Sequence, residues 1–277
     1  MFFVYRILTN LILILSPIII FIRLLKKKEH PKRFKEKLGF YTKKRIKGKL
    51  IWFHGASVGE ILSIIPLIER LEKNKEISQI LITSNTLSSS KVLSNFKLKK
   101  TIHQFFPIDT YYHTRKFLKY WKPTIAFFID SEIWPNMITN IEKMPISLIL
   151  INARITNKSH KRWKIFNSYT QKIFQKFDIC LSSNLKSIKY LKSLGVKKIK
   201  YLGNLKFTQS ERNITDLNIN LKKFFLTKKV WCASSTHLTE ELICAQVHKK
   251  LKAKYKNLLT IIIPRHIHRT KEIINQI

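Results

Sequence analysis

Glycine and proline are scarce in this sequence, and acidic residues are far outnumbered by basic ones. The 277 residues include 6 Gly and 8 Pro, which argues against long flexible linkers. The 16 Asp and Glu residues stand against 53 Lys and Arg, which gives a formal net charge of +37. This charge suits a polyanionic partner, but codon bias in an AT-rich genome would also raise Lys, Ile and Asn together. Charge alone therefore does not select a function.

Cysteine is also rare, and its three positions show no metal-ligand or CxxC spacing. Because Cys180 and Cys232 lie in apolar, strand-like runs, we expect both to be buried, reduced thiols. Zinc spacing, an RNP-type motif and a clear recognition helix are all missing from the sequence, so nucleic acid is not an expected partner. The pattern suits a cytoplasmic domain without disulfides.

An uncharged run of sixteen residues, from Ile7 to Ile22, stands near the N-terminus. It is slightly shorter than a usual membrane-crossing helix, but Arg6 and Arg23 can snorkel to the interfaces. Between Arg23 and Lys49 there are 13 Lys or Arg and two acidic residues, which favours a cytoplasmic location for this segment. We expect residues 1–25 to form one uncleaved anchor helix; the alternative is a helix buried against the domain.

After Lys49, short apolar runs alternate with helical patterns, as is typical of parallel α/β units. The polar segment 208–222 resembles a linker, and a second α/β pattern follows it and stops after two strands, too few for a stable open sheet. The predicted strands are 50–54, 79–83, 102–106, 124–129, 147–151, 179–183, 199–202, 230–234 and 258–263. The predicted helices are 61–72, 111–120, 134–141, 162–175, 185–194 and 239–253.

Glu60 ends the segment HGASVGE, at the junction of a predicted buried strand and a helix. Ligands bind beyond the carboxyl ends of strands in open α/β sheets, so this carboxylate could act as a general base there. The alternative is a glutamate in a first helical turn, where the helix dipole favours it. The segment does not match a Walker A loop, because the Lys and Ser/Thr of that motif are missing.

Asp130 and Glu132 occupy a second strand-to-helix junction, in IDSEIWPN, and are expected at the same edge of the sheet as Glu60. The alternative is helix capping by Asp130 or Ser131. Further polar groups follow later strands in GNLKF, STH and IPRH, where Arg265 could grip a phosphate or carboxylate bidentately.

Together, these motifs resemble the Kdo transferase family, whose members transfer 3-deoxy-D-manno-octulosonic acid (Kdo). The ordered motifs are RFKEKLGFY, HGASVGE, IDSEIWPN, INARIT, GNLKF, STH and IPRH. The resemblance implies an α/β fold of GT-B type with two Rossmann-like domains, the second incomplete, behind an N-terminal hydrophobic anchor helix. It also implies metal-independent, inverting transfer from CMP-Kdo to a lipid A precursor (lipid IVA) in lipopolysaccharide biosynthesis at the inner membrane.

By resemblance, Glu60 is the catalytic base, Asp130 and Lys206 stabilise the transition state, and Pro264 and Arg265 bind CMP. The implied domains are 26–207 for the acceptor, 208–222 as linker and 223–277 as a partial donor domain. Asp130 departs from the family, which usually has Glu there, and this shortens the side chain by one methylene.

The sequence also lacks the glycine-rich and N-P-x-E motifs with which the family continues, so it resembles a member truncated at its C-terminus. We expect the partners to be lipid A precursor, CMP-Kdo and anionic lipids of the inner membrane. The alternative function is an inactive remnant that binds lipid A precursor or an anionic membrane surface without turnover.

Overall fold

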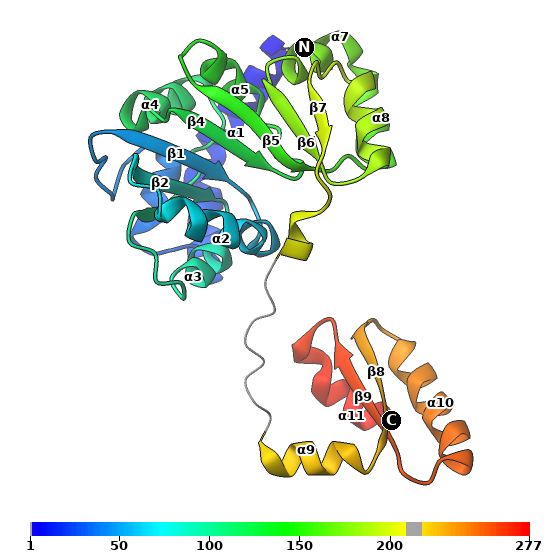
Figure 1. Cartoon of the computed structure of the whole chain (residues 1–277). Coiled ribbons are helices and arrows are strands. Elements are labelled where there is room, and N and C mark those ends of the chain that lie inside the picture. The colour runs from blue at the N-terminus through cyan, green and yellow to red at the C-terminus, as the bar shows by residue number, and fades with distance from the viewer. Residues whose placement is uncertain (1, 209–217) are drawn as a thin grey trace. The chain divides into compact units, whose positions relative to one another are not determined.

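The computed structural model describes residues 2–208 and 218–277, which belong to two compact units, Met1–Ser210 and Glu211–Ile277 (Figure 1). Most of the predicted linker, residues 209–217, lies outside the described residues. The linker prediction was wrong for residues 219–222, because helix α9 (Ile219–Leu226) already begins there. Asn218 caps this helix by accepting a hydrogen bond from the backbone N–H of Asn220. Asparagine is a favoured N-cap residue, but in a segment that is polar throughout it did not stand out as a helix start.

The first unit contains a seven-stranded parallel sheet in the order β3-β2-β1-β4-β5-β6-β7. All seven predicted strands of this unit are present. Their bounds are β1 (Lys49–His54), β2 (Ile77–Ser84), β3 (Thr101–Phe105), β4 (Ile125–Ile129), β5 (Ser147–Ala153), β6 (Ile179–Ser182) and β7 (Ile199–Tyr201). The most buried apolar runs, β1, β2, β4 and β5, form central parallel strands, as their composition predicted, while β3 and β7 form the edges.

Helices cover both faces of this sheet (Figure 1). One face packs against α2 (Val58–Glu72) and α3 (Leu87–Leu93), and the other against α4 (Tyr111–Trp121), α5 (Pro135–Glu142), α7 (Asn167–Phe174) and α8 (Leu185–Ser193). Strand β1 packs against both layers of helices, because Trp52 faces the second helix group and Phe53 faces the first.

Helix α3 was not predicted. The predicted helix 162–175 is divided at Phe166 into α6 (Asn157–Ile165) and α7.

The order of the strands places the loops that follow β1 and β4 side by side. Strand β1 has β2 on one side and β4 on the other, so the direction in which strands are added reverses between β1 and β4. Crevices at such reversal points are the usual ligand sites of open parallel sheets. Asp130 directly follows β4, and Glu60 lies in the first turn of α2, the helix that follows β1, which places both predicted residues at this edge.

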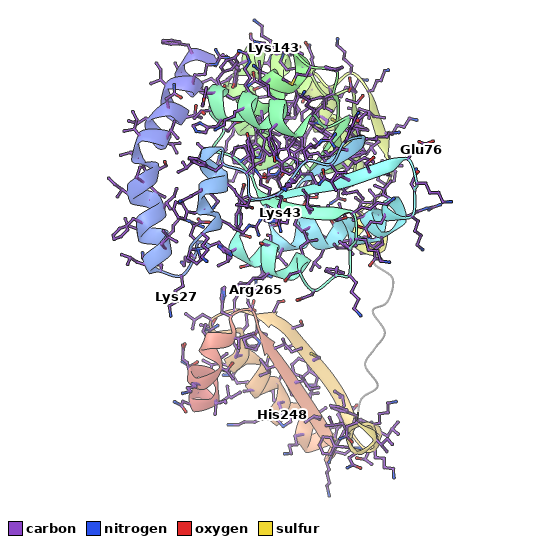
Figure 2. The ribbon with its side chains drawn as sticks, turned by 90° about the vertical axis from the view of Figure 1, so that its left-hand side faces the viewer. Lys27, Lys43, Glu76, Lys143, His248 and Arg265 are labelled. Carbon is purple, nitrogen blue, oxygen red and sulfur yellow. The ribbon has the colours of Figure 1, made fainter. Side chains whose placement is uncertain are left out.

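Helix α1 (Phe2–Leu25) lies against the first unit and buries Thr9, Ser16 and Ile20 (Figure 2). Its other apolar side chains remain largely exposed, and the helix is long and apolar enough to cross a membrane by length and composition. This is consistent with an anchor and differs from the alternative of a buried N-terminal helix.

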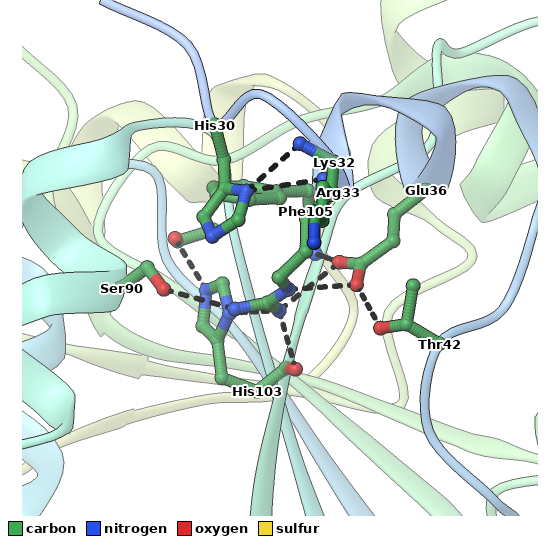
Figure 3. Close-up of polar contacts among 9 residues, drawn as sticks. His30, Lys32, Arg33, Glu36, Thr42, Ser90, His103 and Phe105 are labelled. Carbon is green, nitrogen blue, oxygen red and sulfur yellow. Dashed lines mark hydrogen bonds and ion pairs between the residues drawn. The ribbon is translucent and has the colours of Figure 1, made fainter.

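The segment after α1 is fastened to the sheet edge by a buried ion pair (Figure 3). In the 3₁₀ helix η1 (Arg33–Leu38), Arg33 donates to both carboxylate oxygens of Glu36 at 2.8 and 3.1 Å, and also to His103. The Glu36 carboxylate in turn accepts a hydrogen bond from the backbone of Phe105 at 2.7 Å. These contacts join the RFKEKLGFY motif to β3, which gives that motif a structural role.

The second unit contains the parallel pair β8 (Lys229–Thr236) and β9 (Leu258–Pro264), with α9, α10 (Glu240–Lys254), η3 (Ile267–Arg269) and α11 (Thr270–Gln276). Both predicted strands and the predicted helix are present. Cys180 is buried as predicted, but Cys232 is exposed, which corrects the expectation of a buried thiol. The reason is that Val230, Cys232 and Ser234 alternate onto a face of β8 that is exposed in this unit.

Candidate active site

Glu60 sits in the first turn of α2, where it closes a capping box with Ser57. Its Oε2 accepts the backbone N–H of Ala56 at 2.7 Å, and its Oε1 accepts the Ser57 hydroxyl at 2.7 Å. The helix-terminal role that the sequence offered as an alternative is therefore real. A third and longer bond comes from the backbone N–H of Ser57 to Oε2 at 3.5 Å. A carboxylate has about four lone-pair sites, so these bonds still leave room for a proton from a substrate.

The neighbourhood of Glu60 makes its carboxylate more basic than usual. Burial is the largest cause that raises the pKa of Glu60, and the nearby carboxylates of Glu132 and Asp130 raise it further. The hydrogen bonds from Ser57 and Ala56 lower this pKa but do not cancel the rise. Gly55 allows this packing, because a Cβ there would lie 3.1 Å from Cβ of Glu60 and 2.9 Å from Cδ1 of Ile129. The glycine of HGASVGE therefore permits the close approach of three segments.

Asp130 follows β4 in a left-handed backbone conformation, with φ of +56°. Its backbone N–H donates to Ile151 and its carbonyl accepts from Arg154, so the turn is held against β5 and its continuation. Burial raises the pKa of the carboxyl, while a hydrogen bond from Asn152 and the charges of Lys206 and Arg154 oppose this shift. The structure thus places Asp130 near both Glu60 and Lys206.

Asn152 connects Asp130 to the segment that carries Lys206. Its Nδ2 donates to Oδ1 of Asp130, and its Oδ1 accepts the backbone N–H of Leu205 at 3.1 Å. Leu205 packs into the apolar cluster under α2, and Lys206 follows it with an exposed side chain. The sequence analysis noted INARIT as a motif but gave Asn152 no role. The available signal was an asparagine at the end of an apolar run, a residue type that adopts the left-handed conformation more readily than most, and the structure gives Asn152 a φ of +52°.

Glu132 forms an acidic cluster with Glu60 and Asp130 and was not among the predicted catalytic residues. Its Oε2 lies 3.3 Å from Nε2 of the buried His54 and accepts the indole N–H of Trp134 at 2.8 Å. Burial raises the pKa of Glu132, but the contacts with His54 and Trp134 outweigh it and leave that pKa lowered. A fixed negative charge thus stands beside Glu60 and contributes to its basicity.

The IDSEIWPN motif contributes Asp130 and Glu132 to the site, and its last two residues begin helix α5. Pro135 occupies the first turn of α5, as predicted, but capping by Asp130 or Ser131 does not occur. Instead, the remote and buried Asp109 accepts the backbone N–H groups of Asn136 and Met137 at 3.1 and 2.8 Å. Tertiary structure supplies this cap, so the local sequence could not indicate it.

Pro264 and Arg265 lie in the second unit, where β9 ends. The backbone N–H of Arg265 donates to the carbonyl of Thr236 at 3.0 Å, which joins the ends of β8 and β9. The Arg265 side chain is exposed (Figure 2). The STH and IPRH motifs are therefore neighbours at one edge of the small sheet, where a cationic side chain is available to an anion.

Comparisons with known proteins agree with these motifs. Residues 32–209 match the model of the family described as 3-Deoxy-D-manno-octulosonic-acid transferase (kdotransferase). The chain is 35% identical to the 3-deoxy-D-manno-octulosonic acid transferase of Rickettsia bellii over 98% of its own length and 65% of the relative's. It is 36% identical to that of Rickettsia felis over 82% of its length and 49% of the relative's, so it spans about half to two thirds of these relatives.

Solved structures show a likeness in fold alone. A UDP-GlcNAc 2-epimerase from Neisseria meningitidis bound to UDP-GlcNAc matches with a TM-score of 0.59 at 17% identity, covering 82% of this chain and 68% of that one. The neighbours support an α/β architecture of GT-B type.

Proposed function

The chain belongs to the Kdo transferase family, and from this premise we propose that it transfers Kdo from CMP-Kdo to a hydroxyl of a lipid A precursor such as lipid IVA. The observation that carries the proposal is the meeting of Glu60, Asp130 and the Lys206 segment at the reversal point of the sheet. The first unit would bind the acceptor, and the second would bind the donor through Pro264 and Arg265.

In the proposed reaction, an acceptor hydroxyl oxygen attacks the anomeric carbon of Kdo and inverts its configuration. Glu60 takes the hydroxyl proton as the new C–O bond forms, which suits a carboxylate whose pKa is raised. The bond from the anomeric carbon to the CMP phosphate oxygen breaks, and its electron pair stays on the phosphate. Lys206 offers a positive charge beside Asp130 to stabilise developing charge, without a metal ion.

The location we propose is the cytoplasmic face of the inner membrane, with α1 as the anchor. The long apolar helix and the Lys- and Arg-rich segment behind it support this orientation. The same basic residues would contact anionic lipid head groups.

Replacement of Glu60 by Gln tests the proposal. A Gln side chain can keep the capping-box contacts but cannot take the proton, so Kdo transfer should be lost while thermal unfolding stays near that of the parent chain. The matched control is Glu69→Gln, on the exposed side of the same helix, which should keep full transfer. Normal transfer by Glu60→Gln would remove Glu60 from the mechanism. Salt-sensitive lipid binding by the parent chain without any transfer would favour the non-catalytic alternative.

A further inference from the structure

A mostly apolar cavity lies between α1 and the edge of the first unit. Its volume is about 410 Å³, and its wall includes Leu8 and Ile12 of α1, Phe106 and Pro107 after β3, and Trp134 before α5. The side chains of Leu8 and Ile12 are about half exposed. They can therefore line the cavity and also contact an apolar environment outside the protein. The cavity is therefore bounded by the segment of the chain best suited to contact a lipid bilayer.

Polar contacts fix α1 at this wall, so the cavity belongs to the folded unit. The Tyr5 hydroxyl donates to Oδ2 of the buried Asp109 at 2.7 Å. The next residue, Arg6, donates to Oδ1 of Asn136, and one turn further along α1 Asn136 donates to the Thr9 hydroxyl, both at 3.4 Å. The same Asp109 caps α5, so the position of α1 is coupled to the helix that follows IDSEIWPN.

Phe106 and Trp134, which line the cavity, also lie beside the acidic cluster. The Phe106 ring stacks on the His54 ring with centroids 3.9 Å apart, and the Trp134 ring lies 5.2 Å from Phe106. Trp134 donates its indole N–H to Glu132. A ligand in the cavity would thus lie one side chain away from the carboxylates beside Glu60.

We propose that this cavity binds one acyl chain of the lipid acceptor, a proposal that rests on the proposed function. An acyl chain fits the apolar wall, and entry past the exposed side of α1 would let it arrive from a membrane. Charge favours an anionic head group nearby, because Arg6 follows the cavity-lining Tyr5 in α1 and makes no ion pair among the residues that the structure describes. Holding the chain there would place the head group near the candidate active site.

Binding of single-chain alkyl phosphates below their micelle concentration provides the first test. Affinity of the purified chain should increase about fourfold for each added methylene from hexyl to decyl phosphate, and then level off as the cavity fills. A brominated decyl phosphate should quench tryptophan fluorescence, and Trp134→Phe should abolish that part of the quenching. Binding that is independent of chain length, or quenching unchanged by Trp134→Phe, would overturn the proposal.

A pair of helix variants provides the second test. Ile12→Phe fills the cavity and should weaken decyl phosphate binding on the order of tenfold. Ile14→Phe, on the exposed side of the same helix, is the matched control and should bind normally. Glu60→Gln should also bind normally, so chain binding remains measurable if transfer fails. If Ile12→Phe weakens chain binding but leaves KM for an active lipid acceptor unchanged, the cavity holds an ordinary membrane lipid and the acceptor assignment is wrong.

Discussion

The amide of Asn152 donates a hydrogen bond to the carboxylate of Asp130, and both residues hold the backbone in the left-handed region, with φ of +52° and +56°. Two adjacent strand ends thus turn sharply and meet through their side chains. The other end of the Asn152 amide accepts from Leu205, so one buried side chain sets the distance between Asp130 and the Lys206 segment. Strained turns that meet in this way are typical of functional sites.

Replacement of Asn152 by Ala should lower kcat by about 100-fold with little change in KM, because Asp130 and Lys206 lose their common support. It should also raise the pKa of Asp130, since the hydrogen bond from Asn152 now lowers it. Steady-state kinetics across pH would measure both effects. The matched control is Asn140→Ala, which removes a buried asparagine that contacts Tyr111 and Thr114. Equal losses of kcat in the two variants would show that Asn152 contributes only stability.

The pH dependence of transfer should report the ionisation of Glu60. Because the base must be deprotonated and burial raises its pKa, the acid limb should lie above the ordinary glutamate value of 4.5. Ser57→Ala removes a hydrogen bond that lowers this pKa, so the acid limb should move to higher pH. The loss of the N-cap should also lower the free energy of unfolding by about 1 kcal/mol.

A cap on another helix separates these two effects of Ser57. Thr86 caps α3 by accepting the backbone N–H of Ser89 at 3.2 Å. Thr86→Ala should cost a similar free energy of unfolding, about 1 kcal/mol, and leave the pH profile of transfer in place. An unchanged acid limb in Ser57→Ala would contradict the assignment of that limb to Glu60.

The buried pair of Arg33 and Glu36 should matter far more to stability than a surface pair. Arg33→Met leaves the fully buried Glu36 carboxylate without its cation and should lower the free energy of unfolding by about 3–5 kcal/mol. The exposed pair of Lys49 and Glu76, 3.6 Å apart, is the comparison, and Lys49→Met should change stability by about 0–1 kcal/mol. Chemical denaturation of both variants measures the difference, and similar losses would contradict the structural role of RFKEKLGFY.

His103 should make the first unit sensitive to acid. Burial, with the nearby charges of Arg33 and Lys43, lowers its pKa from 6.5 to about 3. The folded chain therefore keeps His103 neutral where the unfolded chain binds a proton, so its contribution to stability is complete above pH 6.5 and is lost as pH falls toward 3. His103→Gln should flatten the decline of thermal stability over this range. An identical slope in the parent chain and the variant would show that other groups cause it.

The sequence by itself determined the elements that depend on local pattern. Buried apolar runs such as 50–54 and 147–151 predicted parallel strands, because a strand covered on both faces needs apolar residues throughout. The placement of Glu60 and Asp130 beyond strand ends also followed from the sequence, since Asp130 stands directly after such a run and Glu60 begins the helix that follows one. The family motifs could be identified for the same reason, because they are short and continuous.

Tertiary structure decided the features that join distant segments. The strand order brings β1 and β4 together across more than seventy residues, and only this order makes neighbours of Glu60 and Asp130. The cap of α5 by Asp109, the support of Asp130 by Asn152 and the cavity beside α1 each depend on contacts between residues that no local pattern relates. The exposure of Cys232 has the same origin, because burial depends on what covers a strand and its own composition does not specify the cover.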